Sequence, residues 1–381
     1  MTATVPDTQQ ALDAILTDVV GANAERIDRA GSFPREALDA LGAAGVLGLT
    51  CATEVGGGGQ GMRAAAEVIE RLAGQCGSTA MVVLMHYAAT AAIEAHGPAD
   101  VRREIAAGHH LSTLAFSEFG SRSHFWAPLG TASRAGDTVT LDARKSWVTS
   151  AGQADSYVWS SLPMSGDGAM TLWLVRDGTA GLTVAGEFDG LGLRGNGSRP
   201  MTAEGVTVPA DTLLGADGAG LDIALTVPLP WFLVLNAAFC LGLAERAIAE
   251  TGRHLTATTL QHTGAALRDA PVARRDFARL KVRTDALRTF VGDTLTALET
   301  GREDATLRVL QVKALAGETA ADVTDDALRL CGGSAFRKEL GLERTFRDAR
   351  AARVMAPTTD ALYDFVGRVS TGLPLLDEAN K

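Results

Sequence analysis

Apolar residues at helical spacing define the first part of the chain. From about residue 7 to residue 110 they are spaced so that they fall on one side of a helix, as in Leu38, Leu41, Val46 and Leu47. This is the period of one face of an α-helix, and the stretch has few β-branched runs. The pattern predicts an N-terminal helical domain over residues 1–112.

Between residues 111 and 218 the pattern changes to short runs in which apolar and polar residues alternate. The runs are TVTLDARKSWVT, SYVWSSL, TLWLVR and GLTVAG. Gly-Asp, Asp-Gly and Ser-Gly pairs, which favour turns, separate them. A period of two is typical of a strand with one buried face. We therefore predict a middle antiparallel β-domain over residues 113–218.

Helical spacing returns after Leu221 and continues toward the end of the chain. Apolar residues recur at helical spacing in one stretch with Leu280, Val282, Leu287 and Val291, and in a later one with Val312, Leu315, Ala316, Val323, Ala327 and Leu330. We therefore expect a C-terminal helical bundle over residues 219–381. Helices, then strands, then helices make the predicted fold class α+β.

Composition and charge narrow the range of functions. A chain of 381 residues with 46% hydrophobic residues can bury a large core. Its formal net charge of -10 favours neither nucleic acid nor anionic lipid as a partner, so a small molecule is expected. The four cysteines, at positions 51, 76, 240 and 331, form no CxxC pair. This spacing argues against a metal site or a disulfide scaffold and for reduced, packed thiols.

Neither a targeting segment nor a membrane span is expected. The first twenty residues mix acidic and apolar residues and lack the basic-then-apolar order of a signal peptide. The apolar stretch 221–243 is interrupted by Pro228 and Pro230, and we expect it not to cross a bilayer. These features predict a cytoplasmic protein.

A run of four glycines at 56–59 invites comparison with a phosphate-binding loop. It has no Lys-Ser or Lys-Thr after it and no predicted strand before it. We therefore interpret the run as a flexible connector between helices.

Five motifs occur in the order found in one known family. They are DRAGSFPREALDALGAAGVLGLTCATEVGGGG, AFSEFGSRSH at 115–124, KSWVTSAGQADSYV at 145–158, LRGNGSRPMTAEGVTVPADTLLG at 193–215, and KALAGETAADVTDDALRLCGGSAF with LERTFRDAR at 313–350. From about Ile27 to Arg368 the chain resembles acyl-CoA dehydrogenases. The resemblance implies an N-terminal helical domain, a middle antiparallel β-domain, a C-terminal four-helix bundle, and FAD as the cofactor.

An isoalloxazine ring needs an aromatic or apolar wall and hydrogen-bonding groups, and residues of these motifs can supply both. Within one subunit the resemblance assigns this role to Phe116, Ser117, Ser123, Trp147, Thr149 and Ser150. It implies that Gly332, Gly333, Thr358 and Asp360 approach the FAD of a neighbouring subunit, and hence a shared-cofactor dimer or tetramer. Taken alone, Trp147 is also typical of a core strand and Gly332 of a helix C-cap.

The carboxylate that removes the substrate α-proton in the family is missing. Most members carry it as Glu in a Tyr-Glu-Gly-Thr stretch after Arg-Asp-Ala-Arg. Here Arg347–Arg350 is followed by AARVMAPT, which places Ala356 and Pro357 at the matching positions. Other members carry it on the first helix of the last domain, but PLPWFLVLNAAFCLG at 228–242 holds no carboxylate, and Phe232 falls near that position.

An arginine that pairs with the FAD diphosphate of the other subunit in the family is missing too. It usually precedes a Gln-x-Gly, where this chain has Thr259 and Leu260. Arg329 replaces a family Gln on a nearby helix. We hypothesise that Arg329 restores the lost positive charge.

Two residues of the 115–124 motif are candidates for catalysis. His124 has a side chain whose ordinary pKa lies near neutrality, although a single loop histidine is more often a surface residue. The planar guanidinium of Arg122 can hold a phosphate, a carboxylate or the flavin itself.

The substrate pocket is expected to contain His86, Tyr87, Phe232 and Ala356. His86 and Tyr87 have an equally good interpretation as a polar pair at the edge of the core. Asp348 and Arg350 are expected to form structural ion pairs.

Three functions are consistent with these features. The first is a flavin oxidoreductase acting on an acyl thioester, CoA- or carrier-protein-bound, with a non-standard base and a flavoprotein electron acceptor. The second is a flavin-dependent monooxygenase, served by a flavin reductase, because oxygen chemistry needs no α-proton abstraction. The third is a non-redox relative that binds thioesters.

Overall fold

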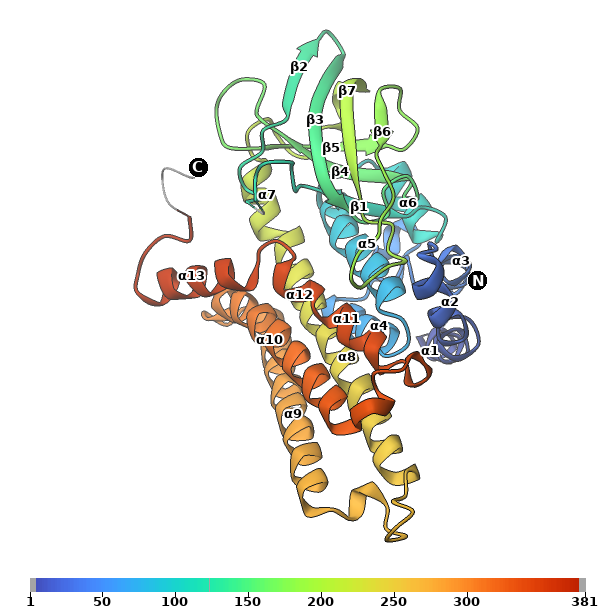
Figure 1. The fold of residues 1–381 in the computed structure, drawn as a ribbon. Coiled ribbons are helices and arrows are strands. Elements are labelled where there is room, and N and C mark those ends of the chain that lie inside the picture. The colour runs from blue at the N-terminus through green and yellow to red at the C-terminus, as the bar shows by residue number, and fades with distance from the viewer. Residues whose placement is uncertain (1–4, 123, 377–381) are drawn as a thin grey trace.

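The computed structural model describes residues 5–122 and 124–376. Helices form the first and last parts and strands the middle, so the predicted α+β fold class is confirmed. Figure 1 shows the strands at one end of the molecule and the long C-terminal helices extending away from them. Ser123 and the last five residues lie outside the described residues.

The N-terminal helices pack beside the strands and against the long helix α8. Their bounds are α1 Val5–Ile15, α2 Ala22–Ala30, α3 Arg35–Ala43, α4 Met62–Ala73, α5 Gly77–His96 and α6 Ala99–Ala106. Almost all of α5 is buried, because α4, α8 and β1 surround it. It is therefore apolar on most of its circumference rather than along one stripe.

The glycine run at 56–59 is a hydrogen-bonded turn rather than a flexible connector. The N–H groups of Gly57, Gly58 and Gly59 donate to the carbonyls of Ala52, Gly48 and Cys51 at 2.8–3.0 Å. These donors are therefore not free to bind a phosphate. A Cβ on Gly57 would lie 2.3 Å from the Cys51 carbonyl oxygen, so only glycine fits there.

The strands form two sheets. The first has the order β1-β4-β5, from Ser112–Ala115, Ser156–Ser161 and Thr171–Arg176. The second has the order β2-β3-β7-β6, from Thr131–Ala135, Thr138–Val148, Arg199–Pro209 and Leu182–Val184. Four of these strands, β3 to β6, fall within the four alternating runs, so the prediction of those strands is confirmed.

One pairing differs from the predicted antiparallel domain, because β1 and β4 run parallel with Ser112 opposite Ser156. Parallel neighbours need a long connection, and here it contains the β2-β3 hairpin of the other sheet. The alternating runs predict strands but carry no information on the direction of their neighbours. The domain is therefore mixed rather than purely antiparallel.

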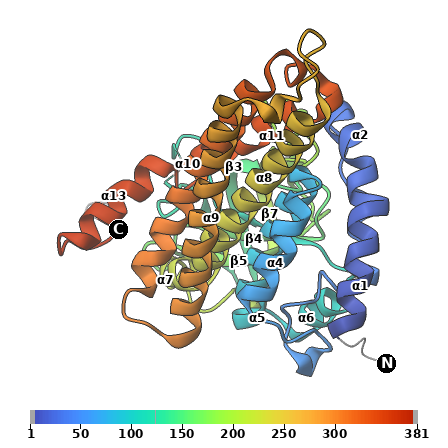
Figure 2. The same ribbon diagram turned by 90° about the horizontal axis from the view of Figure 1, so that it is seen from below.

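The C-terminal part is built on three long helices, α8 Pro228–Ala257, α9 Pro271–Thr300 and α10 Ala305–Cys331. Helix α10 packs against α8 and α9 and also contacts the shorter α11 Leu342–Ala349, α12 Ala351–Val354 and α13 Thr359–Ser370. Figure 2 shows α13 projecting on the side opposite α1 and α2.

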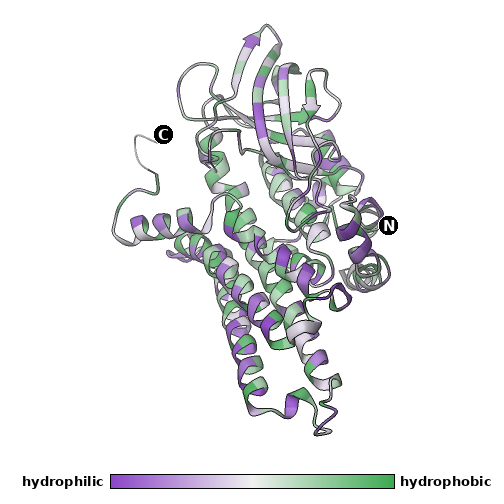
Figure 3. Cartoon of the chain, viewed as in Figure 1, coloured by the Kyte–Doolittle hydropathy of each residue, from purple (hydrophilic) through white to green (hydrophobic). Residues whose placement is uncertain are grey.

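Helix α8 continues the short helix α7, Gly220–Thr226. The expected interruption at Pro228 and Pro230 is a break of one residue, Val227, between α7 and α8. Pro228 lies at the first turn of α8, where its missing N–H has no helical partner to lose. Gly220–Ala257 is consequently long and apolar enough to span a membrane by length and composition. Of its most apolar window, 67% is buried inside the protein, as in a core helix. Figure 3 shows the hydrophobic residues gathered on its upper half.

The four cysteines are buried and free, as expected. Among the residues that the structure describes, no group of three or more His, Cys, Asp or Glu side chains is arranged to hold a metal ion.

Candidate functional site

A cavity of about 870 Å³ lies where the strands meet both sets of helices. Its walls come from Met85 of α5, the loop 116–125 after β1, the end of β3, the loop 188–198 and the start of β7, the start of α8, and residues 347–356, which run from α11 to just past α12. This volume lies in the range of cofactor and substrate sites. The cavity is the candidate active site.

The wall is mainly apolar and aromatic. Aromatic side chains come from the loop after β1, from β3, from the loop before β7 and from α8: Phe116, Phe119, Phe125, Trp147, Phe188 and Phe232. The sequence did not single out Met85, Phe188 or Leu191, because apolar residues of a loop or a fully buried helix show no period that marks a cavity.

Trp147 has the most unusual conformation on this wall. Its φ is 56°, in the left-handed region that bulky residues rarely adopt, and the residue is 70% exposed. The ring meets Phe188 edge to face at 6.5 Å. An exposed tryptophan held in a strained conformation at a cavity is typical of a ligand-contacting residue rather than of a core aromatic.

Unpaired hydroxyl groups line the same cavity. Within the described residues, the side chains of Ser117, Ser146, Thr149 and Ser198 have no hydrogen-bond partner. Ser150 does not line the cavity: it is buried, and its N–H donates to the carbonyl of Asn196 at 3.0 Å. An apolar wall with a few free hydroxyls fits a flat heteroaromatic ligand such as the flavin of FAD.

Glu118 is the acidic residue among the described residues that line the cavity, and its carboxylate is fully engaged. Its Oε1 accepts a 2.5 Å hydrogen bond from Lys145 Nζ. Its Oε2 accepts from the N–H groups of Leu129 and Gly130 at 2.7 and 2.8 Å. Lys145 is also buried, and burial lowers its pKa to about 8 although Glu118 opposes the shift. Glu118 is therefore a structural anion and not a free base.

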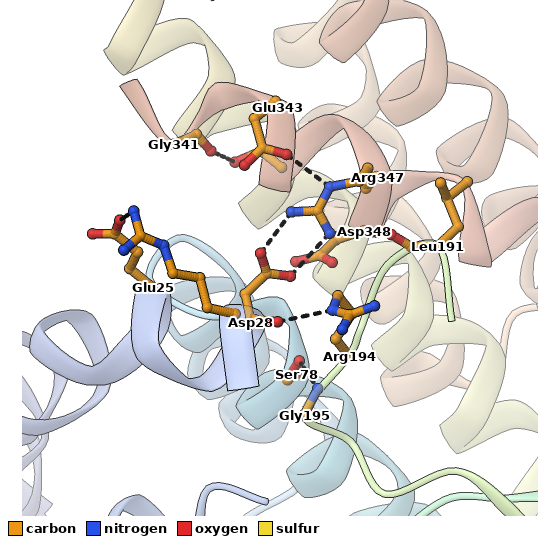
Figure 4. A network of polar contacts seen from close by, with 12 residues as sticks. Glu25, Asp28, Ser78, Leu191, Arg194, Gly195, Gly341, Glu343, Arg347 and Asp348 are labelled. Carbon is orange, nitrogen blue, oxygen red and sulfur yellow. Dashed lines mark hydrogen bonds and ion pairs between the residues drawn. The ribbon is translucent and has the colours of Figure 1, made fainter. Parts of the chain in front are cut away.

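Arg347 ties the cavity wall to the N-terminal helices (Figure 4). Its guanidinium donates two hydrogen bonds to the Asp28 carboxylate, at 2.9 and 2.6 Å, and one to Glu343 at 2.7 Å. It also donates to the carbonyl of Leu191 at 3.1 Å, in the loop that forms part of the cavity wall. The sequence assigned no role to Arg347.

The expected ion pair of Asp348 is not formed among the described residues. This carboxylate is buried, accepts from the Leu193 N–H at 2.7 Å, and packs against Gly77 at the start of α5. Burial raises the pKa of Asp348 to about 7. Arg350 does pair with an acid, Asp325, at 3.6 Å. Asp348 thus holds the cavity wall in place by accepting a hydrogen bond from the Leu193 backbone, not by an ion pair.

The two catalytic candidates of the 115–124 motif behave differently. Arg122 lines the cavity, whereas His124 does not. The His124 ring is exposed, its Nδ1 lies 2.7 Å from the Ser121 carbonyl, and it packs edge to face on Trp126. Ser123, expected to bind the cofactor, lies outside the described residues.

His86 and Tyr87 do not line the cavity. The His86 Nδ1 accepts from the Ser112 N–H at 3.1 Å, so Nε2 carries the proton and donates to the Leu47 carbonyl at 3.0 Å. The Tyr87 hydroxyl donates to the Val46 carbonyl at 2.6 Å. Both side chains are buried and join α5 to neighbouring segments. The cavity residue of this helix is Met85, one position earlier.

The buried, hydrogen-bonded position of His86 makes the stability of the protein depend on pH. Burial lowers the pKa of His86 from 6.5 to about 4, so protonation is easier in the unfolded chain than in the folded one. Stability should fall by about 3 kcal/mol as pH drops through this window. In His86→Gln, whose amide can make both hydrogen bonds, urea unfolding between pH 4 and 6.5 should show a correspondingly smaller slope. An unchanged slope would contradict the assignment.

Phe232 and Ala356 do line the cavity, where the sequence placed them. The backbone around Ala356 is fixed by Lys313 of α10, whose Nζ donates to the carbonyls of Ala352, Met355 and Pro357 at 3.0, 2.8 and 2.6 Å. Burial lowers the pKa of Lys313 to about 7.

The residues expected to reach a neighbouring subunit's cofactor lie away from this cavity. Gly332 is the C-cap of α10, with a φ of 60°, and Gly333 follows it. Thr358 is the N-cap of α13, its hydroxyl accepting from the Ala361 N–H at 3.3 Å, and Asp360 lies in the first turn. Their role toward a second subunit stays a prediction.

Arg329 is already balanced by acids of its own chain. Its guanidinium donates to Asp326 at 3.2 Å and lies 3.6 Å from Asp276. This pairing weakens the hypothesis that Arg329 supplies a free positive charge for a cofactor.

The fold and the cavity together define a class of protein: two helical parts enclose a mixed β-domain, and all three contribute to one cofactor-sized site. Family profiles match in the same order. The N-terminal domain of acyl-CoA dehydrogenases matches residues 4–108, the middle domain residues 113–206, and the C-terminal domain residues 218–371. The chain belongs to the acyl-CoA dehydrogenase family.

Individual members of the family are similar to this chain over nearly its full length. The cyclohex-1-ene-1-carbonyl-CoA dehydrogenase of Geobacter metallireducens is 28% identical over 369 residues, covering 95% of each chain. The butyryl-CoA dehydrogenase of Megasphaera elsdenii has a similar structure, with a TM-score of 0.89 and 23% identity over 97% of this chain and 100% of that one. The prolyl acyl carrier protein oxidase AnaB superimposes with a TM-score of 0.87 and 18% identity, covering 97% and 100%.

Proposed function

We propose that the protein is an FAD-dependent oxidoreductase that acts on an acyl thioester, bound to CoA or to a carrier protein. The cavity carries this proposal, because its aromatic wall, its free hydroxyls and the strained Trp147 suit a flavin beside an apolar acyl chain. Relatives named as CoA dehydrogenases and as a carrier-protein oxidase support the class of substrate.

FAD would accept a hydride from the substrate, and the protein would supply the walls around the flavin. Phe116, Trp147 and Phe188 would exclude water from the reacting carbon, and Ser117 and Thr149 would donate hydrogen bonds to ring acceptors. What the described lining does not supply is a free carboxylate, since Glu118 is bound by Lys145 and two backbone N–H groups. Simple acyl-CoA substrates should therefore reduce the enzyme slowly.

The visible spectrum of the purified protein, followed by anaerobic titration with acyl-CoA and acyl-carrier thioesters, tests the proposal. A flavin absorption band that bleaches with one of these thioesters supports it. A colourless protein that binds thioesters but cannot be reconstituted with FAD contradicts it and supports the non-redox alternative.

Restoring a carboxylate at residue 356 should accelerate the reaction. Ala356 lines the cavity on a backbone that Lys313 holds in place. In Ala356→Glu, the rate of anaerobic flavin reduction by a simple acyl-CoA should rise about 100- to 10,000-fold, the usual contribution of a positioned base. Ala356→Gln, which has nearly the same shape but no base, is the matched control. Equal rates in the two variants would show that proton removal at this position is not what limits the reaction.

The absence of a free carboxylate from the described lining also favours a second candidate, a flavin-dependent monooxygenase, whose chemistry does not begin with α-proton removal. Oxygen consumption that requires added reduced flavin, without bleaching by thioesters, would identify this function. The electron partner differs accordingly: a flavoprotein acceptor for the dehydrogenase, and a flavin reductase for the monooxygenase.

We also propose a homo-oligomer, a dimer or a tetramer, in which Gly332, Gly333, Thr358 and Asp360 approach the cofactor of a second copy. The positions of these residues away from their own cavity support this arrangement.

A further inference from the structure

The charges around the cavity do not cancel. Within residues 5–122 and 124–376, three arginines line it, Arg122, Arg347 and Arg350, together with one acid, Glu118. Glu118 is already paired with Lys145 at 2.5 Å, so it offers no compensation to the arginines.

Two of the three arginines have partners inside the protein. Arg347 is bonded to Asp28 and Glu343. Arg350 donates to the Ala321 carbonyl at 2.9 Å, lies 3.6 Å from Asp325, and stacks on Phe346 at 3.9 Å. Their guanidinium groups are therefore committed to holding α10, α11 and the N-terminal helices together.

Arg122 is different. Among the described residues it has no hydrogen bond and no ion pair, and its side chain is exposed at the rim of the cavity. Its φ is 46°, so the backbone turns through the left-handed region at a residue that has no conformational preference for it. The cavity thus carries one uncompensated positive charge, located where solvent meets the apolar interior.

We propose that Arg122 binds a phosphate ester of the ligand that enters the cavity, with the apolar part of that ligand inside and its phosphate at the rim. A planar guanidinium matches phosphate oxygens with two parallel hydrogen bonds. The inference rests on the proposed function, because both ligands named there carry such a group: the diphosphate of FAD, and the phosphates of CoA or of a carrier-bound pantetheine. A carboxylate at the far end of the acyl chain would lie inside the cavity and would not reach Arg122 at the rim.

Binding by ligand pairs that differ in phosphate tests this proposal without measuring turnover. Apoprotein of the full chain is titrated with FAD and with riboflavin, and separately with an acyl-CoA and the corresponding acyl-pantetheine. In Arg122→Gln the dissociation constant of one phosphate-bearing ligand should rise about 10- to 100-fold, the range for a charge-assisted pair. Its phosphate-free counterpart should change less than about twofold. The affected pair identifies the source of the phosphate.

Three further variants separate charge from backbone effects. Arg122→Lys keeps the charge and should recover part of the affinity, whereas Arg122→Gly suits the left-handed backbone and should be as weak as Arg122→Gln. Arg134→Gln, an exposed arginine on β2 bonded to the Gly136 carbonyl, should change nothing.

The proposed role of Arg122 would be overturned if Arg122→Gln weakened the binding of the phosphate-bearing and the phosphate-free ligand equally in each pair. It would also be overturned if the substitution weakened the binding of neither. Such a result would leave the proposed function standing if the wild-type protein still binds FAD and is reduced by a thioester. Wild-type protein that binds neither flavin nor thioester would instead refute the proposed function itself.

Discussion

Replacing Lys145 with methionine is expected to lower the free energy of unfolding by about 3–5 kcal/mol, the range for removing one partner of a buried ion pair. The side chains of Lys145 and Glu118 are 0% and 2% exposed. Loss of the ammonium leaves the Glu118 carboxylate in the interior without its counterion. The Ser160 carbonyl and hydroxyl, which accept from Lys145 at 2.7 and 2.8 Å, lose their donor as well.

Urea unfolding of four proteins measures this: wild type, Lys145→Met, Glu118→Gln and the double variant. Because the neutral amide needs no counterion, the double variant should be more stable than Lys145→Met alone. Lys281→Met removes an exposed i,i+4 pair with Asp285 and should cost less than about 1 kcal/mol. If the two lysine substitutions were equally mild, the buried pair would contribute no more than a surface one.

Arg347→Met should lower the free energy of unfolding by a similar amount and should also weaken flavin binding. The guanidinium and Asp28 are 17% and 11% exposed, and their two parallel hydrogen bonds join α11 to α2. Removing the cation leaves Asp28 unpaired, with an expected loss of about 3–5 kcal/mol. The Leu191 carbonyl also loses its donor, which loosens the loop that forms one cavity wall.

The matched control is Arg63→Met. Arg63 makes the same two-pronged contact with Glu299, at 2.8 and 2.7 Å, but the pair is 41% and 49% exposed and lies away from the cavity. Its removal should cost less than about 1 kcal/mol and leave flavin affinity unchanged. Thermal or urea unfolding, together with flavin titration, distinguishes the two arginines. Equal losses of stability in both variants would mean that burial does not strengthen the Arg347 contact.

The periodicity of apolar residues predicted the helical and strand segments well, because burial of one face acts on every second or every third to fourth residue. Strand direction was not predictable in this way: β1 pairs parallel with β4 although forty residues separate them. The two prolines in 221–243 mark a break of only one residue, Val227, because Pro228 occupies the first turn of α8 and the helical path resumes there.

The candidate site was predicted less completely than the fold. Motif comparison named residues that do line the cavity, among them Trp147, Thr149 and Phe232, since these carry recognisable chemistry. His86 was misassigned because a polar residue on an apolar helix has the same appearance whether it faces a cavity or bridges two backbones. Arg347 was missed because its partner, Asp28, lies 319 positions away in the sequence.

Lys313 has a consequence for how this protein could change its chemistry. The buried Lys313 ammonium donates to three main-chain carbonyls within residues 352–357, so the path of this segment depends on α10 and not on the side chain at 356. An acid can be exchanged for alanine at that point, or regained, while the surrounding scaffold keeps its shape. A single substitution at position 356 would therefore be enough to change the reaction while the fold stays the same.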